Sequence, residues 1–237
     1  VVPLLFIALN AVEGNLQNAQ GTAKTTGLES WLLEKGLEIE PSFIIDASCG
    51  SVSVQQRQGF FTINTPVQFP FLPLITNFAE HPITDGLEQV MFPFASPVRF
   101  VGDSTTSFTP IVNSSSQAGI VRAPTFFDIN KNWTAADFPL SNVALAGILE
   151  GNIVGNIPSR IVLVGDGDFG ISGQQGRGQS EDNINLLVNS IDWLSDDTGL
   201  IELRTKGVAT RPIKQEYLGE EADGKRAFIK YLNFGLP

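Results

Sequence analysis

The sequence predicts an α/β fold in which a mainly parallel β-sheet has helices on both faces and carries an inserted β-rich hairpin arm. Two segments, one near each end of the chain, have the pattern strand, helix, strand. Short alternating or proline-broken runs lie between them, as in hairpins and edge strands. At 237 residues and 42% hydrophobic content, the chain can bury a large core. We expect one main domain at 1–205 with the β insertion around 52–115, and a juxtamembrane tail at 206–237.

The first strand–helix–strand unit begins with the apolar run PLLFIAL at 3–9. GLESWLLEKG at 27–36 then has its apolar residues at helical spacing and ends in a glycine, which is typical of a helix end. SFIIDAS at 42–48 indicates the next strand. A right-handed crossover through the helix would make these two strands parallel.

The second unit lies between residues 160 and 206. IVLVG at 161–165 is typical of a strand buried on both faces, and a loop of Asp, Gly and Ser follows it. Ser180 is placed to cap the next helix, and LIEL from residue 200 indicates another strand. We expect the inner face of the helix to hold Ile184, Leu187, Val188, Ile191 and Leu194.

A further continuous apolar run, NVALAGILEG at 142–151, precedes this unit. Its composition is also that of a buried strand. One mainly parallel sheet is therefore expected to contain the segments 3–9, 42–47, 142–149 and 160–165.

Polar residues follow several of these strands. In open α/β sheets, ligands bind at the carboxyl ends of the strands. If the strands are parallel, the candidate ligand-binding edge consists of Asn10, Asp46, Cys49, Asp166 and Asp168. Acidic groups there favour a cationic or hydroxyl-rich ligand over a phosphate. The alternative for GDGDF at 165–169 is a turn whose Asp side chains bond the loop backbone. A calcium-loop pattern is lacking, and no metal site is predicted.

An aromatic segment at 59–78 is interrupted by prolines, which favours an exposed edge arm. Such an arm is suited to docking against a partner or a second copy. The candidate partner surface consists of Phe60, Phe61, Phe69 and Phe71. The alternative is that these rings belong to the core, where most aromatic side chains lie.

Cys49 and His81 are the only cysteine and the only histidine, so a nucleophile–base pair would need both. The segment ASCGS lacks the glycine two residues before the nucleophile that a sharp elbow requires. His81 precedes a proline, which restricts it to extended conformations and suits a turn. We therefore predict structural roles for both and no catalytic residue.

Charge and composition exclude several further functions. The net charge of −10 argues against nucleic-acid binding, and one cysteine excludes an internal disulfide. No motif indicates a cofactor. No run reaches the roughly 18 to 20 apolar residues of a membrane span. The apolar start and the basic cluster before YLNFGLP suggest an excised domain with membrane attachment through segments beyond this sequence, a soluble tail being the alternative.

GDGDF, a helix ending in DWL and the phrase LIELRTK together resemble the extracytoplasmic domain of gliding-motility-associated ABC-transporter auxiliary proteins, which are substrate-binding-like. The segments 27–50, 77–98 and 143–153 resemble the same family, in the same order. The resemblance implies a class I glutamine-amidotransferase-like fold, related to flavodoxin-like sheets, without amidotransferase chemistry. It also implies membrane-tethered proteins that accompany an ABC permease and ATPase.

We accordingly expect a non-enzymatic auxiliary domain that binds a ligand or a partner protein within an ABC-type transport system. Its expected location is the periplasmic face of the bacterial inner membrane. The alternative is an amidotransferase-like or hydrolase-like enzyme that uses Cys49 or the loop of Asp166 and Asp168.

Overall fold

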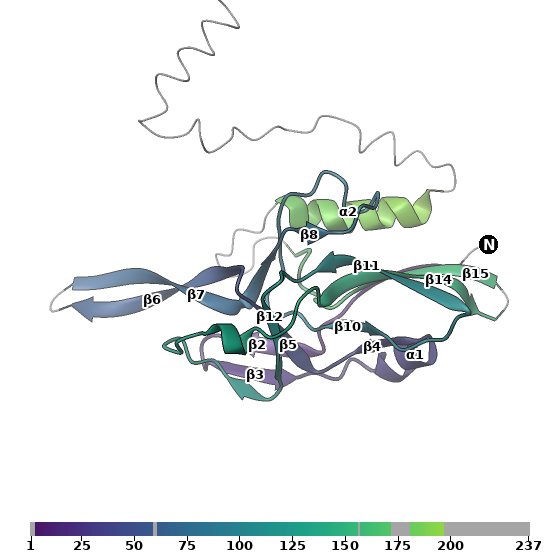
Figure 1. Cartoon of the computed structure of the whole chain (residues 1–237). Coiled ribbons are helices and arrows are strands. Elements are labelled where there is room, and N and C mark those ends of the chain that lie inside the picture. Colours follow the sequence, from purple (N-terminus) through teal and green to yellow (C-terminus); the bar gives the residue numbers. More distant parts are fainter. Residues whose placement is uncertain (1–2, 59–60, 156, 172–180, 197–237) are drawn as a thin grey trace, which may run out of the picture. The chain divides into compact units, whose positions relative to one another are not determined.

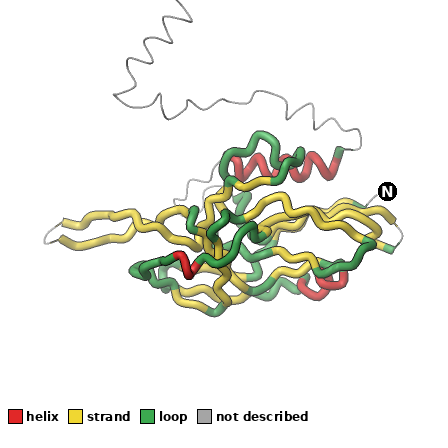
Figure 2. The backbone as a smooth tube through the Cα atoms, in the orientation of Figure 1, coloured by secondary structure: helices red, strands yellow, loops and turns green. Residues whose placement is uncertain are grey.

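A computed structural model describes residues 3–58, 61–155, 157–171 and 181–196 (Figures 1 and 2). Strands dominate this part of the chain: they are β1 (Leu4–Ala8), β2 (Val12–Asn15), β3 (Gln20–Ala23), β4 (Leu37–Ile39), β5 (Ser42–Asp46), β6 (Cys49–Gln58), β7 (Phe61–Ile75), β8 (Asn77–Phe78), β9 (Val90–Met91), β10 (Val98–Phe100), β11 (Thr106–Asn113), β12 (Ala118–Arg122), β13 (Thr125–Phe126), β14 (Ala144–Val154) and β15 (Ile157–Val164). The described helices are α1 (Glu29–Glu34), α2 (Glu181–Ser195) and the short 3₁₀ turn η1 (Ala135–Asp137).

The predicted α/β fold is wrong. The strands form several small sheets that are antiparallel or mixed, with only two α-helices among the described residues. The expectation of an amidotransferase-like or flavodoxin-like parallel sheet with helices on both faces falls with it.

The largest sheet has the strand order β1-β15-β14-β11-β8. Its one parallel pair is β1 with β15, in which Phe6 lies opposite Val162. β14 ends at Val154 and β15 begins at Ile157, so their connection is two residues long. A link this short permits only antiparallel pairing, whereas a parallel pair needs a crossover of a dozen residues or more. The sequence prediction placed these two strands in one sheet correctly but gave the wrong direction.

β5 does not join this sheet, so the prediction that segment 42–47 belongs to it is wrong. It pairs antiparallel with β12, with Ile44 opposite Ile120. On its other side, Ile44 donates a backbone hydrogen bond to Ala95 O, and Ser96 N donates to Gly165 O. The segment at 95–96 therefore lies between β5 and the end of β15. A Cβ at Gly165 would collide with the Ser96 carbonyl oxygen, so this close approach requires glycine.

Alternate residues of the large sheet enter two different cores. Val162 and Val164 face the cluster that also contains Leu186 and Leu194 of α2. Leu163 lies on the opposite face of the sheet, where it packs in the cluster formed with α1, β4 and β10. Figure 1 shows α2 on one side of this sheet and α1 with β4 and β10 on the other. This double coverage explains why the strands are apolar without alternation.

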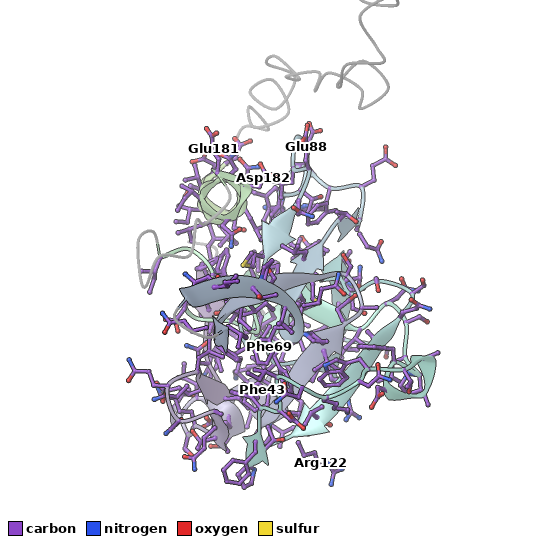
Figure 3. All side chains as sticks on the ribbon, turned by 90° about the vertical axis from the view of Figure 1, so that its left-hand side faces the viewer. Phe43, Phe69, Glu88, Arg122, Glu181 and Asp182 are labelled. Carbon is purple, nitrogen blue, oxygen red and sulfur yellow. The ribbon has the colours of Figure 1, made fainter. Side chains whose placement is uncertain are left out.

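A third core is aromatic and lies at the base of the β6–β7 hairpin. Its members are Val12, Phe43, Ile45, Phe69, Phe71, Leu72, Phe94 and Phe127. Phe43 meets Phe71 edge-to-face at 5.7 Å between ring centroids, a favourable arrangement for aromatic pairs. The ring of Phe94 packs against Gly14 and that of Phe43 against Gly21, where a Cβ would clash with the rings. Figure 3 shows Phe43 and Phe69 inside the molecule.

The outer part of the β6–β7 hairpin projects from the rest of the molecule (Figures 1 and 2). We call residues 51–58 and 61–68 of this hairpin the arm. Within it Ser51 lies opposite Gln68 and Val54 opposite Thr65. β7 then continues into the body, where Leu74 and Ile75 pair with β9. The arm is therefore anchored at one end by a strand that runs through both regions.

No helix in the described ranges is long and apolar enough to cross a membrane. The predicted strand from residue 200 and the predicted tail at 206–237 lie outside the described residues. The proposed division at residue 205 therefore stays a prediction.

Candidate functional site

The structure brings together Asn10, Asp166 and Asp168 at the carboxyl ends of β1 and β15. The Asn10 side chain accepts a hydrogen bond from Gly167 N at 2.7 Å and donates one to Asp168 Oδ2 at 2.9 Å. Asp168 N in turn donates to Asp166 Oδ1 at 2.8 Å. Parallel pairing of β1 with β15 accounts for this meeting, since both strands end at the same edge.

This cluster is built as a turn. The backbone bond to Asp166 spans two residues, as in an Asx-turn, and Asp166 is fully buried. Phe169 follows as a core side chain stacked on Phe92, with 5.7 Å between ring centroids. In the described part of the chain, no three metal-ligating side chains are grouped so as to hold an ion. The contacts favour the turn interpretation, and a ligand-binding role for the edge stays a prediction.

Asp46 and Cys49 belong to other sheets: Asp46 is the last residue of β5 and Cys49 is the first residue of β6. The Asp46 carboxylate accepts hydrogen bonds from Ser48 N at 2.8 Å, Ser115 N at 2.7 Å and Ser115 Oγ at 2.7 Å. Burial raises the pKa of the Cys49 thiol, a hydrogen bond from the Phe69 backbone opposes this, and the nearby Asp46 charge raises it further. A thiol with a raised pKa is a poor nucleophile at neutral pH.

His81 has different surroundings. Its Nδ1 accepts a hydrogen bond from Ile83 N at 3.2 Å, and its ring meets Trp193 of α2 edge-on with centroids 5.1 Å apart. Burial lowers the pKa of His81, the Glu150 charge opposes this, and the Arg160 charge lowers it further. The charges that shift the pKa values of Cys49 and His81 belong to other residues, and neither residue shifts the pKa of the other. Structural roles for both residues stay a prediction.

The Phe-rich partner surface is wrong for the two rings that the structure describes. Phe69 is 1% and Phe71 3% exposed, and both belong to the aromatic core. Phe60 and the side chain of Phe61 lie outside the described residues. The outer part of β7 is an edge, as the prolines indicated, but toward its base β7 lies between β6 and β9 and is buried on both faces.

The sequence reasoning missed Asn183, which is fully buried in the first turns of α2. Its amide donates to Met91 O at 2.7 Å and to Phe169 O at 2.8 Å, and accepts from Met91 N at 3.1 Å. One side chain therefore joins α2, β9 and the GDGDF turn. The buried residues of α2 are Asn183, Leu186, Ser190 and Leu194, so only Leu194 of the predicted inner face is fully buried. A polar residue in line with the apolar ones was the signal that could have revealed Asn183.

The preceding residue, Asp182, reinforces this junction. Its Oδ2 accepts backbone hydrogen bonds from Glu88 at 2.8 Å and Gln89 at 2.9 Å. Figure 3 shows Glu88 beside Asp182 at the start of the helix. The acidic first turn of α2 therefore binds the loop that precedes β9.

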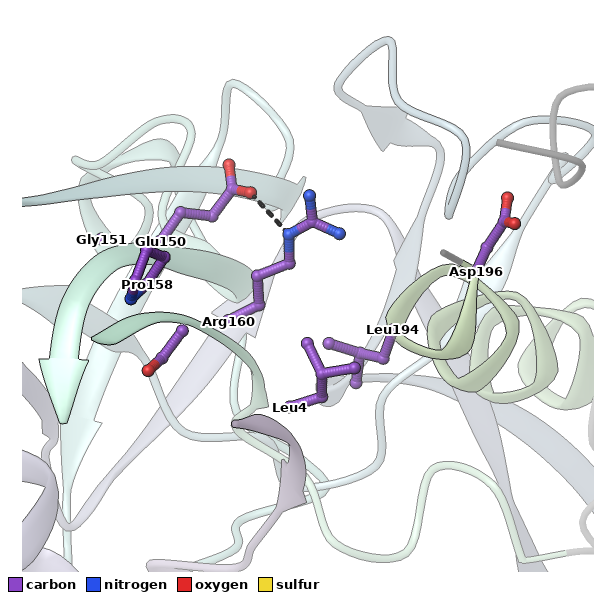
Figure 4. A pocket seen from close by; sticks show the side chains of 8 residues that line it. Leu4, Glu150, Gly151, Pro158, Arg160, Leu194 and Asp196 are labelled. Atoms are coloured by element: carbon purple, nitrogen blue, oxygen red, sulfur yellow. Dashed lines mark ion pairs between the residues drawn. The ribbon is translucent and has the colours of Figure 1, made fainter. Parts of the chain in front are cut away.

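A cavity of about 430 Å³ opens at the other end of β1 and β15 (Figure 4). Arg160 and Glu150 form its polar wall, with Arg160 Nε 3.2 Å from Glu150 Oε1. The Arg160 guanidinium also lies over the Trp193 ring, 4.8 Å from its centroid. Leu4 and Leu194 supply apolar walls. Arg160 and Glu150 already pair with each other, so the cavity does not single out one class of ligand.

The arm offers a different kind of site. In the part of the chain that the structure describes, its two strands pair only with each other. Val52, Val54 and Val67 are half-buried on one face, while Ser51 and Ser53 are exposed on the other. Arg57 is the only charged residue between 50 and 76. The arm therefore presents two edges that carry a single charge between them, and their backbone N–H and C=O groups are available to another strand.

Comparison with known proteins identifies one family. No curated protein and no solved structure matches the chain. Residues 4–217 match the family described as "ABC-type uncharacterized transport system". The match covers most of the sequence, and the chain therefore belongs to this family of auxiliary components of ABC-type transport systems.

Proposed function

We propose that this chain is a non-enzymatic, extracytoplasmic auxiliary domain that binds another protein subunit of its transport assembly through the arm. The observation that carries the proposal is the projecting β6–β7 hairpin with its two open edges. Strand addition to such an edge gives affinity through main-chain hydrogen bonds.

The isolation of the arm supports a binding role. Val52 at the base of the arm packs against the aromatic core. Beyond it the arm has only two strands, and an isolated two-stranded hairpin is at best marginally stable in water. Natural proteins usually protect edge strands with charges, prolines or a covering element. Within the arm, the ten-residue strand β6 has one charged residue and no proline. A partner strand would supply the missing hydrogen bonds and packing.

The polar side chains support a non-enzymatic role. Asn10, Asp46 and Asp168 are engaged in hydrogen bonds within the chain. Burial raises the pKa of Cys49, which disfavours the reactive thiolate. These contacts hold turns together, whereas a catalytic group needs to reach a substrate.

The partner that we propose is the permease of an ABC system, acting together with its ATPase. Family membership supports association with transporter components. The finer assignments, a gliding-motility type of system and the periplasmic face of the inner membrane, follow from the phrases GDGDF and LIELRTK that the chain shares with such proteins.

Co-purification with co-expressed subunits tests the proposal. The chain is expressed with the permease and ATPase of a transport system whose genes neighbour its own. In the test variant Asn-Gly replaces residues 53–66, which joins the Val52–Val67 pair by a two-residue turn. We expect permease recovery to fall by at least about tenfold, the equivalent of about 1.4 kcal/mol. Phe126→Ser, which alters an exposed ring on β13, is the control.

Melting temperatures accompany this experiment. The shortened chain should melt close to the unaltered chain, because none of the deleted residues that the structure describes belongs to the three cores. Equal permease recovery with and without the arm would contradict the proposal.

Thiol labelling tests the location. Ser53→Cys is made in a Cys49→Ala background, so that the arm carries the sole thiol. In intact spheroplasts, a membrane-impermeant maleimide should label this thiol to the same extent as in lysed cells. Labelling only after lysis would place the domain in the cytoplasm.

A further inference from the structure

We infer that the free edge of β6 pairs antiparallel with β6 of a second copy of this chain, which joins the two arms into one four-stranded sheet. The inference rests on the proposed function, because it takes the arm to be a binding element. It goes further in naming the edge of the arm that pairs, a second copy of this chain as a further partner beside the permease, and the symmetry of the pair. The paired segment that we assign is Ser51–Gln55, which the structure describes in full.

The two edges of the arm are not equivalent. β7 contains Pro66, and Pro70 and Pro73 follow it toward the base. Proline has no N–H to donate to a neighbouring strand, so β7 is a poor template for strand addition. β6 has no proline along its whole length. An added strand should therefore choose the β6 edge.

The charge distribution favours a second copy as the partner. The chain carries a net charge of −10, so two copies repel each other over most of their surfaces. The arm escapes this repulsion because Arg57 is its only charged residue. With a twofold axis at Ser53, Arg57 lies opposite Cys49 of the other copy and not opposite another arginine. The segment that projects farthest is thus the one least opposed to self-association.

The side-chain pattern is compatible with the same symmetry. In an antiparallel pair about Ser53, Val54 of one copy lies opposite Val52 of the other, and both valines stay on one face. Cross-strand pairs of β-branched side chains stabilise sheets by about 0.2–1 kcal/mol each. The half-buried valines would form one continuous stripe across the two arms.

The arrangement also closes on itself. Twofold pairing uses the β6 edge of both copies and leaves the two β7 edges outside. These outer edges carry Pro66, which discourages further addition. We therefore expect dimers and not open chains of molecules.

The first test compares the dissociation constants of the dimer for paired variants, measured by sedimentation over a concentration series. Val52→Lys with Val54→Lys places two charges per copy on one face of β6; because Val52 also packs against the aromatic core, the melting temperature of this variant is measured as well. Thr65→Lys with Val67→Lys places the same number on the same face of β7, directly across the hairpin. The β6 pair should raise the dissociation constant at least about tenfold. The β7 pair should leave it close to that of the unaltered chain.

The second test locates the axis by disulfide formation. Single cysteines are placed from Ser51 to Gln55 in a Cys49→Ala background, with Asn64→Cys on β7 as the control. Directly opposed residues in an antiparallel pair lie about 4.5–5.5 Å apart between Cα atoms, within disulfide range. Only the residue at the axis lies opposite the same residue of the other molecule. Cross-linking should therefore peak at one position and fall on both sides.

Several outcomes would overturn the inference: a single-chain mass at every concentration, equal weakening by the β6 and β7 lysine pairs, or strongest cross-linking at Asn64→Cys. Permease capture separates its failure from that of the proposed function. If the chain stays monomeric but loses the permease when the arm is shortened, partner binding stands and self-pairing falls. If the chain dimerises through β6 yet captures the permease without the arm, self-pairing stands and partner binding falls.

Discussion

β15 and the arm portion of β7 are both strands, but they occupy opposite environments. β15 is paired on both edges, by β1 and β14, and the side chains from Ile161 to Val164 are buried on both faces. The arm portion of β7 is paired on one edge only, and its inner face is half-covered. Stability should therefore depend strongly on substitutions in the covered region and weakly on those in the arm, whereas association should show the reverse.

Phe69→Ala should have the largest effect of the substitutions considered. Phe69 is buried among Phe71, Phe94 and Phe127, so removing its ring leaves a cavity that costs about 3–5 kcal/mol of unfolding free energy. The matched control is Val67→Ala, two residues closer to the tip of the same strand, which should cost less than about 1 kcal/mol. Denaturant titration measures both. Similar losses would show that the arm is as firmly packed as its base.

Asn183→Ala should have the next largest effect. The substitution leaves Met91 N, Met91 O and Phe169 O without their partner, and a buried polar group left unpaired costs about 1–3 kcal/mol. Asn185→Ala is the control on the same helix, since Asn185 is exposed. Hydrogen exchange of the Met91 amide should accelerate only in the first variant. An unchanged rate would mean that Asn183 does not hold β9 to the helix.

The sequence predicted burial better than it predicted pairing. Continuous apolar runs at 3–9 and 160–165 identified β1 and β15, and these do pair in parallel as expected. The helix at 29–34 and its end before Gly36 were also correct. Strand direction failed because it depends on the two-residue connection between β14 and β15, which an apolar run does not encode.

Two features of the site were beyond sequence pattern alone. Asn10 could be placed beside Asp168 because both follow strands of one parallel pair. Asp46 was placed with them on the assumption of a single sheet, but its partner Ser115 comes from a distant loop. Asn183 was overlooked because periodicity identifies apolar faces and gives no weight to a buried amide.

His81→Gln should change how stability depends on pH. Burial lowers the pKa of His81 in the folded chain, so protonation favours unfolding. The contribution of neutral His81 is fully present above the unfolded pKa of about 6.5 and is lost as pH falls through the lower folded value. The unfolding free energy of the unaltered chain, relative to the variant, should therefore decline below about pH 6.5. Because the chain has one histidine, a constant difference across this range would contradict the shifted pKa.

Glu150→Gln should have the smallest effect on stability. Glu150 and Arg160 are 44% and 41% exposed, and exposed ion pairs contribute at most about 1 kcal/mol. The loss should disappear in about 1 M salt, where charges are screened beyond about 3 Å.

The same substitution should nevertheless be visible at His81. The Glu150 charge raises the pKa of this histidine, so Glu150→Gln should move its NMR titration to lower pH, and Arg160→Gln should move it to higher pH. Val54→Lys in the arm is the control and should leave the titration in place. The His81 ring contacts Trp193 of α2, and Arg160 of the large sheet lies over the same Trp193 ring. Opposite shifts from Glu150→Gln and Arg160→Gln would show that charges on the sheet act on a histidine packed against the helix. Shifts of the same sign, or an equal shift from the arm variant, would show that His81 senses only the net charge of the chain.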